Sequence, residues 1–301
     1  MAKFRGAYTA LITPMRGDEV DDEALRQLVE AQITAGIDGL VPCGTTGEAA
    51  TLSLAEQLHV IDIVVKAARG RVPVLAGAGS NNTRTAIDTT RACFELGVDG
   101  TLQVTPYYSK PPRAGLLAHF RAIADAAPLP IVLYNIPGRT ASDMDAELVA
   151  CLAEHPRIVG IKEATGDMAR AAQVRELCGP DFDLLSGDDF SLLPFLAAGG
   201  DGVISVVSNV IPGTIADLCR AARDGDWHGA QRLHTLHLPL TRALFTTANP
   251  IPVKAAMAML GRCQDDVRLP LLPLDADAPE RAPLRAALHN LDQLGHLGEE
   301  R

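Results

Sequence analysis

Short apolar runs alternate with longer segments of helical period along most of this chain. Val, Ile, Leu and Ala dominate each run, and Gly, Pro, Asn or Thr residues bound it, which is the pattern of a buried strand. Eight such runs follow one another: Ala7–Ile12, Leu40–Pro42, Val72–Ala76, Thr101–Val104, Pro130–Leu133, Ile158–Ile161, Phe182–Leu185 and Val203–Val206. We therefore expect eight short strands.

The segments between these runs carry apolar residues about three and four positions apart, which places them on one face of a helix. The predicted helices are Asp22–Ala35, Leu54–Ala68, Arg84–Leu96, Gly115–Ala126, Met144–Ala153, Ala169–Leu177, Ser191–Ala198 and, after the last strand, Ile215–Ala222. Strands that alternate with helices through short connections pair in parallel by right-handed crossovers. The sequence therefore predicts an α/β fold, a (β/α)8 TIM barrel, with a doubly wound open sheet as the alternative.

Three helix-to-strand junctions repeat one pattern, in which glycine ends a helix and the next strand begins after an aspartate and a second glycine. They are 36–39, 97–100 and 200–202. Beyond them, residues 225–301 are predicted to hold the helices Trp227–Leu244, Pro252–Leu260 and Pro283–Leu294. We expect residues 1–224 to form the barrel with the active site, and residues 225–301 to form a C-terminal helical extension packed on it.

The charge and cysteine pattern narrows the classes of partner. A net charge of -10 and no basic run disfavour nucleic acid and anionic membrane as partners. No apolar stretch reaches the roughly 20 residues of a membrane span, and residues 1–6 lack the apolar core of a signal peptide. The six cysteines are scattered singly: Cys43, Cys93, Cys151, Cys178, Cys219 and Cys263. We expect a cytoplasmic protein with reduced thiols and a small-molecule partner.

Lys162 is the main catalytic candidate. It ends the apolar, β-branched run that begins at Ile158, and alternation along a strand puts Ile158, Gly160 and Lys162 on one face. If that face lines a barrel, burial favours the neutral amine, which is a nucleophile, and Gly160 leaves room beside it. The alternative for this segment alone is a lysine that extends into solvent, the commoner place for its charge.

Further candidates follow other strands, where a barrel places its working residues. Thr45 and Thr46 lie between glycines, so that hydroxyls and backbone N–H groups can converge on a carboxylate; a tight turn capped by threonines is the alternative. Tyr134, on the strand next to that of Lys162, can move protons at a substrate held there. Arg139, in a Pro-Gly turn, can clamp a carboxylate, although a lone loop arginine is usually only a surface residue.

Three other motifs are given no catalytic role, and the two histidines among them are interpreted as structural or solvent-facing. Asp188 and Asp189 fit helix N-caps better than catalysts. The stretch 77–80 resembles a nucleotide-binding loop but lacks its third glycine. His234 and His237 have no carboxylate partner in pattern, so no metal site is predicted.

Together these motifs resemble the dihydrodipicolinate synthase family, also called 4-hydroxy-tetrahydrodipicolinate synthase. The resemblance runs from Gly6 to about Leu294 and rests on motifs at 44–48, 105–108, 134–140, 160–166, 186–189 and 249–254. It implies a lyase of lysine and diaminopimelate biosynthesis that condenses pyruvate with aspartate 4-semialdehyde and needs no cofactor.

The resemblance also implies roles for single residues. Lys162 matches the Schiff-base lysine and Tyr134 the proton-relay tyrosine, with Thr46 and Tyr108 completing its triad. Thr45 and Thr46 match the residues that hold the pyruvate carboxylate, and Arg139 the one that receives the aldehyde's carboxylate. Gly187 and Ile204 match pocket-lining backbone carbonyls. The family is typically a homotetramer, a dimer of dimers in which the tyrosine at position 108 reaches into the neighbour's site.

The effector pocket of lysine-inhibited members matches positions that include Ala50, Asn81 and Tyr107 here. Three positions depart from the inhibited pattern, because Leu54, Gln57 and Thr85 replace histidines and a glutamate. Losing an acidic partner leaves the ammonium of lysine poorly paired, so we expect weak or no inhibition. Two rival functions remain: an N-acetylneuraminate lyase or 2-keto-3-deoxy sugar-acid aldolase of the same superfamily, and a non-catalytic carboxylate-binding protein on the same barrel.

Overall fold

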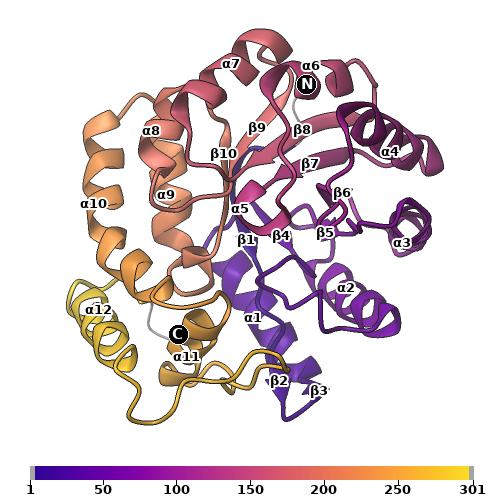
Figure 1. Cartoon of the computed structure of the whole chain (residues 1–301). Helices are drawn as coiled ribbons and strands as arrows, with labels where there is room; N and C mark the ends of the chain where they lie inside the picture. The colour runs from indigo at the N-terminus through magenta and orange to yellow at the C-terminus, as the bar shows by residue number, and fades with distance from the viewer. Residues whose placement is uncertain (1–3, 298–301) are drawn as a thin grey trace.

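The computed structural model describes residues 4–297, and a ring of eight parallel strands lies at its centre (Figure 1). The strands pair in the order β4-β1-β10-β9-β8-β7-β6-β5. A parallel bridge between Leu40 and Val74 joins the two ends of this order and closes the ring. The strands are β1 (Gly6–Ala10), β4 (Gly39–Val41), β5 (Leu75–Gly77), β6 (Gly100–Val104), β7 (Ile131–Asn135), β8 (Ile158–Glu163), β9 (Asp183–Ser186) and β10 (Gly202–Ser205). The predicted TIM barrel is confirmed, and closure excludes the open sheet.

Helices surround the ring and connect successive strands (Figure 1). They are α1 (Asp22–Thr34), α2 (Leu54–Ala68), α3 (Thr83–Glu95), α4 (Arg113–Ala126), α6 (Ala146–Ala153), α7 (Met168–Cys178), α8 (Leu192–Ala197) and α9 (Pro212–Arg223). The start of α2 is fixed by local residues. Ser53, just before the helix, and Glu56, in its first turn, form a reciprocal capping box. Helix α2 therefore begins and ends at the predicted residues.

Four short elements were not predicted from the sequence. They are the hairpin of β2 (Met15–Arg16) and β3 (Glu19–Val20), the one-turn helix α5 (Pro137–Thr140) and the 3-10 turn η1 (Val207–Asn209). Each has too few residues to show a period of two or of 3.6. Tyr134 was expected just after its strand, but the observed strand β7 continues through Asn135 and includes it.

The strand that carries Lys162 departs from simple alternation. In the pairing of β7 with β8, Ile131 lies opposite Ile158, but the next residue, Val132, lies opposite Gly160. Val159 therefore has no partner on β7 and forms a β-bulge in β8. Ile158 consequently packs in the cluster between strands and helices, whereas Val159 packs against the barrel interior. The prediction that Ile158 shares a face with Lys162 was wrong, because this bulge reverses the facing of the residues before it.

The repeated aspartates at the helix-to-strand junctions fix neighbouring strands to one another. Asp38 Oδ2 accepts the N–H of Ala7 at 2.8 Å, Asp99 Oδ2 that of Val74 at 2.8 Å, and Asp201 Oδ2 that of Leu184 at 2.9 Å. In each case the acceptor lies at the start of one strand and the donor at or near the start of the strand before it. The junctions therefore stop helices and also satisfy backbone donors at the amino-terminal end of the barrel.

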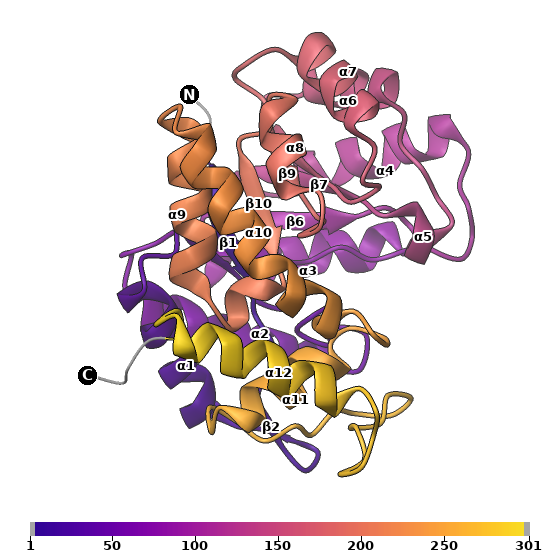
Figure 2. The same cartoon turned by 90° about the vertical axis from the view of Figure 1, so that its left-hand side faces the viewer.

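The C-terminal residues pack against the barrel as three helices: α10 (Trp227–Leu244), α11 (Ile251–Met259) and α12 (Arg281–Gln293) (Figure 2). Their apolar side chains, such as Leu240, Val253 and Leu284, belong to the same hydrophobic cluster as Leu25 and Val203 of the barrel. A segment without helix, 261–280, crosses back between α11 and α12 and lies beside the β2–β3 hairpin, where Gly17 N–H donates to Asp266 Oδ2 at 2.8 Å. Within residues 4–297, no helix is long and apolar enough to cross a membrane.

We predict that Asp99→Ala lowers the free energy of unfolding by about 1–3 kcal/mol, because it leaves the buried N–H of Val74 without its acceptor. Urea denaturation followed by circular dichroism measures this. Asp88→Ala is the matched control, since Asp88 is an exposed residue of α3 that lies 4.0 Å from Arg91. Equal stability of the two variants would contradict the structural role of Asp99.

Candidate active site

Lys162 lies inside the barrel beside Tyr134. The two residues are Cα partners on the adjacent strands β8 and β7, and the Lys162 side chain is buried, at 7% exposure. Its Nζ lies 4.4 Å from the centroid of the Tyr134 ring. Tyr134 is 6% exposed and packs in the interior cluster with Leu185 and Ile204. A primary amine and a phenol thus share one enclosed space near the carboxyl ends of the strands.

The glycine that leaves room for Lys162 is Gly187. A Cβ at Gly187 would lie 2.8 Å from Lys162 Cε and 2.5 Å from Ala164 Cβ. Gly160, which was expected to have this role, instead makes room for Asp183, because its Cβ would lie 2.5 Å from the Asp183 backbone oxygen. The two glycines therefore serve different contacts, and the expected role of Gly160 was wrong.

The loop after β4 presents two threonines with different surroundings. Thr45 is exposed, whereas Thr46 is 3% exposed and accepts a hydrogen bond from Asn249 Nδ2 at 3.0 Å. Thr46 still has its own hydroxyl proton to donate. Thr13 Oγ1 donates to Gly47 O at 2.7 Å and ties the loop to the end of β1. Contacts from both ends of the chain therefore fix the shape of this loop.

Arg139 and Tyr108 are exposed residues that follow the strands β7 and β6. Arg139 is exposed on α5, and the next residue, Thr140, accepts a hydrogen bond from Thr105 Oγ1 at 3.1 Å, which ties α5 to the end of β6. Tyr108 is 90% exposed and has a left-handed backbone, with φ +72°. Its phenol therefore does not reach the buried ring of Tyr134 within one chain.

A polar network behind the strands holds the ends of β7 and β8 together. Asn135 Nδ2 donates to Asp143 Oδ1 at 2.9 Å and to Glu163 Oε2 at 3.1 Å, and Arg170 pairs with Asp143. Burial raises the pKa of Glu163, while the Arg170 guanidinium lowers the pKa of Asp143. Because Glu163 follows Lys162 directly, this network sets where the active-site end of β8 lies.

Several residues that support the site have no predicted role in the sequence. Asn135 and Glu163 bond to each other at the strand ends that carry Tyr134 and Lys162, Asn249 bonds to Thr46, and Lys254 bonds to Glu48. The motif from Asn249 to Lys254 was noted only as part of the family resemblance. Its contact with a loop some two hundred residues earlier depends on the tertiary fold, which no local pattern contains.

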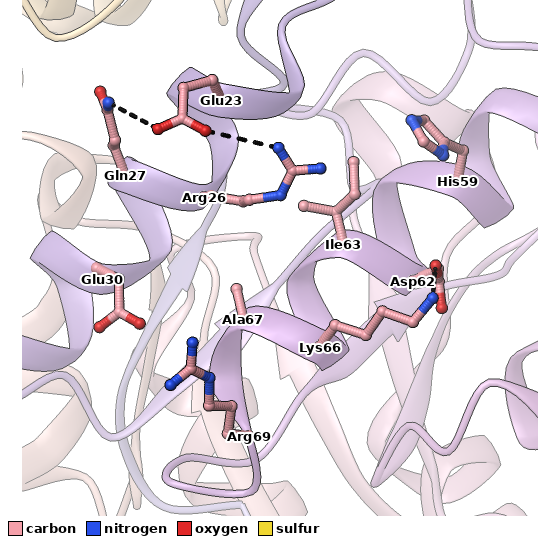
Figure 3. Close-up of a pocket in the computed structure, with 10 residues that line it drawn as sticks. All are labelled: Glu23, Arg26, Gln27, Glu30, His59, Asp62, Ile63, Lys66, Ala67 and Arg69. Atoms are coloured by element: carbon pink, nitrogen blue, oxygen red, sulfur yellow. Dashed lines mark hydrogen bonds and ion pairs between the residues drawn. The ribbon is translucent and has the colours of Figure 1, made fainter.

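A surface hollow of about 630 Å³ lies elsewhere, between α1 and α2 (Figure 3). Its walls are mostly charged side chains already paired with each other or with neighbours, such as Arg26 with Glu23, Lys66 with Asp62, and Glu30 with Arg71. It contains none of the residues predicted for catalysis. Most of its charges are therefore accounted for by surface ion pairs, and we assign it no catalytic part.

His234 and His237 are structural residues of α10. His234 Nδ1 lies 3.1 Å from His237 Nε2, and His237 Nδ1 lies 2.8 Å from Thr241 Oγ1. His237 is fully buried, and burial lowers its pKa to about 3. In the described part of the chain, no group of three or more His, Cys, Asp or Glu side chains is placed to hold a metal ion.

Comparison with known proteins assigns the family. The family model of the dihydrodipicolinate synthetase family matches residues 3–290. The chain belongs to this family.

A relative from Maridesulfovibrio salexigens, named 4-hydroxy-tetrahydrodipicolinate synthase, is 54% identical over 272 residues, which are 90% of this chain and 93% of the relative. The solved synthase from Methylacidiphilum fumariolicum has a TM-score of 0.94 at 42% identity and covers 98% of this chain and 99% of its own. A chloride-inhibited synthase from Acinetobacter baumannii, solved with pyruvate, also has a TM-score of 0.94 at 42% identity, with 96% and 99% covered.

Most of the positions predicted to match the family's effector pocket are exposed. Ala50, Asn81 and Thr85 are exposed, and so are Leu54 and Tyr107, at 46% and 41%. Asn81 Nδ2 donates to Tyr107 O at 3.4 Å. Gln57 is directed inward instead, because its Nε2 donates to the backbone oxygens of Ala49 and Leu52 at 2.8 and 3.2 Å.

We predict that His237 makes this family member sensitive to acid. Its folded pKa of about 3 lies below the unfolded value of 6.5, so the unfolded chain binds a proton first as pH falls. Protonation of His237 in the unfolded chain lowers the free energy of unfolding by about 2 kcal/mol at roughly pH 5 and has no effect well above pH 6.5. Urea denaturation between pH 7.5 and 5 measures it. His237→Gln should lose less stability over this range than the wild type, and exposed His228→Gln should match the wild type.

Proposed function

We propose that this chain catalyses the Schiff-base condensation of pyruvate with L-aspartate 4-semialdehyde to 4-hydroxy-tetrahydrodipicolinate, a step of lysine and diaminopimelate biosynthesis. The observation that carries the proposal is the buried amine of Lys162, 4.4 Å from the centroid of the Tyr134 ring. Family membership supports it, as do relatives above 50% identity that bear this enzyme's name.

Lys162 is the nucleophile in this proposal. Its amine attacks the keto carbon of pyruvate, and loss of water leaves an iminium that withdraws electrons from the adjacent methyl group. A methyl proton then passes to the Tyr134 relay, and the resulting enamine attacks the aldehyde carbon of the second substrate, which restores the iminium. The amino group of that substrate then attacks the iminium carbon, closes the ring of the product and releases the amine of Lys162. No metal or organic cofactor takes part in these steps.

Tyr134 is the residue proposed to move protons, because it is the phenol next to the amine on the neighbouring strand. Thr46 and Tyr108 are proposed to complete its proton relay. Thr45 and Thr46 receive the pyruvate carboxylate, and Arg139 on α5 receives the carboxylate of the aldehyde. Gly187 and Ile204 line the pocket with their backbone carbonyls, and Gly187 also leaves space for the lysine side chain.

The assembly proposed for the enzyme is a homotetramer built as a dimer of dimers. The conformation of Tyr108 supports this assembly. The residue has a positive φ, which costs free energy, and its side chain is 90% exposed in the single chain. Contact with the site of a neighbouring subunit would offset that free energy. We further propose a cytoplasmic location, which the six free cysteines support. An isolated subunit would then have an incomplete proton relay.

We predict that Lys162→Ala retains the fold but loses activity by at least about a thousandfold, because it deletes the nucleophile. Sodium borohydride reduction in the presence of pyruvate, followed by peptide mass mapping, should find a covalent adduct on Lys162 of the wild type and none on the variant. Lys66→Ala is the control, since Lys66 lies on the surface of α2. A wild type that binds pyruvate without forming an adduct would be a carboxylate-binding protein instead.

The choice of aldehyde is tested in the same preparation. Turnover with aspartate 4-semialdehyde should exceed turnover with sugar aldehydes, because the exposed guanidinium of Arg139 offers two donors to a carboxylate. Faster turnover with N-acetylmannosamine or with glyceraldehyde would assign the chain to the sugar-acid aldolases of the same superfamily.

We also predict that lysine inhibits this enzyme weakly or not at all. The positions that match the effector pocket carry Leu54 and Thr85, neither of which offers an acidic partner for an ammonium group, and the amide of Gln57 is bonded to the backbone. Initial rates at fixed substrate and increasing lysine measure this. Strong inhibition at low lysine concentration would refute this prediction. In that case, lysine should inhibit a Thr85→Glu variant no more strongly than the wild type.

A further inference from the structure

The motif from Asn249 to Lys254 has no role in the chemistry proposed above, yet it contacts the loop that holds Thr45 and Thr46. Asn249 Nδ2 donates to Thr46 Oγ1 at 3.0 Å, and Lys254 Nζ donates to Glu48 Oε1 at 2.6 Å. The two residues of the first contact are separated by 203 positions in the sequence, and those of the second by 206. The C-terminal extension therefore reaches the substrate loop of the barrel directly.

The Lys254–Glu48 ion pair is fully enclosed. Lys254 is 0% exposed and Glu48 is 3% exposed. The second carboxylate oxygen of Glu48 accepts the backbone N–H of Arg268 at 3.0 Å, so both oxygens have a donor. Burial of two charges costs solvation that their attraction only partly offsets, so such a pair contributes little net stability but fixes its partners in one geometry.

The loop between Cys43 and Glu48 needs this kind of support. Both of these residues have φ +55°, in the left-handed region that residues with a side chain rarely adopt. The strained ends hold the segment with Thr45 and Thr46 in a shape that local preference alone does not favour. Lys254 anchors one of these ends, and Asn249 anchors Thr46 within the segment.

The charge of Glu48 gives Lys254 a second effect. Glu48 lies two residues from Thr46, in the loop proposed to bind a carboxylate, and an unpaired anion there would repel that substrate group. Pairing with the ammonium of Lys254 cancels this charge and leaves the threonine hydroxyls and backbone N–H groups to face the substrate.

We propose that Lys254 and Glu48 are positioning residues, which act through the Thr45–Thr46 loop to set the affinity for the carboxylate of the keto acid. Neither residue contacts a substrate in this proposal, which rests on the proposed function. It makes helix α11 of the C-terminal extension part of the binding apparatus.

Lys254→Met tests the proposal, because methionine retains an unbranched apolar stem and removes the ammonium. We expect the KM for pyruvate to rise by at least about tenfold, with kcat at saturating pyruvate and the KM for the aldehyde changed by less than about threefold. The pyruvate concentration that gives half-maximal borohydride trapping on Lys162 should rise in parallel. If Lys254 had a purely structural role, Lys254→Met would lower the melting temperature but would not raise the KM for pyruvate selectively over kcat.

Glu48→Gln provides a second variant if Lys254→Met does not fold. It keeps an amide oxygen that can accept from Lys254, so a smaller rise in the KM for pyruvate is expected. Glu30→Gln is the matched control, because it breaks the exposed ion pair with Arg71, whose atoms lie 2.6 Å apart, on the surface of the barrel. Its KM for pyruvate should equal that of the wild type.

The outcomes separate this inference from the proposed function. Trapping of pyruvate by the wild type, with a KM for pyruvate unchanged in the folded variants, overturns the positioning role alone. A wild type that traps no pyruvate overturns the proposed function, and the inference with it. A rise in the KM for pyruvate in Lys254→Met and Glu48→Gln, but not in Glu30→Gln, supports both.

Discussion

Closure of the eight-stranded ring is the constraint on which the rest of this structure depends. The bridge between Leu40 and Val74 joins the last open edge, so the inward side chains of all strands meet in one enclosed core. Only such a core can bury the stem of Lys162 against the ring of Tyr134 while both remain at the carboxyl ends of their strands. In an open sheet, the same two strands would present these side chains to a helix layer instead.

The support for the site comes from outside the ring, from two directions. Asn135 donates to both Glu163 and Asp143 on the helix side of β7 and β8, and these contacts hold the strand ends that carry Tyr134 and Lys162. The C-terminal extension contacts the loop after β4 through Asn249 and Lys254. The candidate groups on the inner face are therefore fixed by polar contacts on other faces, which leaves the interior free for a substrate.

The charges within the site, rather than the net charge of the protein, suit a small anionic substrate. A net charge of -10 would repel a carboxylate substrate from most of the surface. Within the site, the cationic candidate is Arg139, and the acidic Glu48 is neutralised by its buried partner Lys254. The net charge thus disfavours an anionic partner in general, while the site offers Arg139 where a carboxylate is proposed to bind.

The sequence by itself determined the alternation of strands and helices, and with it the parallel barrel, because periodicity and turn residues act locally. It also indicated Lys162, Tyr134 and Arg139, since each follows or ends a recognisable strand. Only the tertiary structure decided that the bulge at Val159 turns Ile158 outward, that Gly187 rather than Gly160 clears space for Lys162, and that Lys254 meets Glu48. These features depend on the register between strands and on contacts between residues far apart in the chain, which have no signature in the order of neighbouring residues.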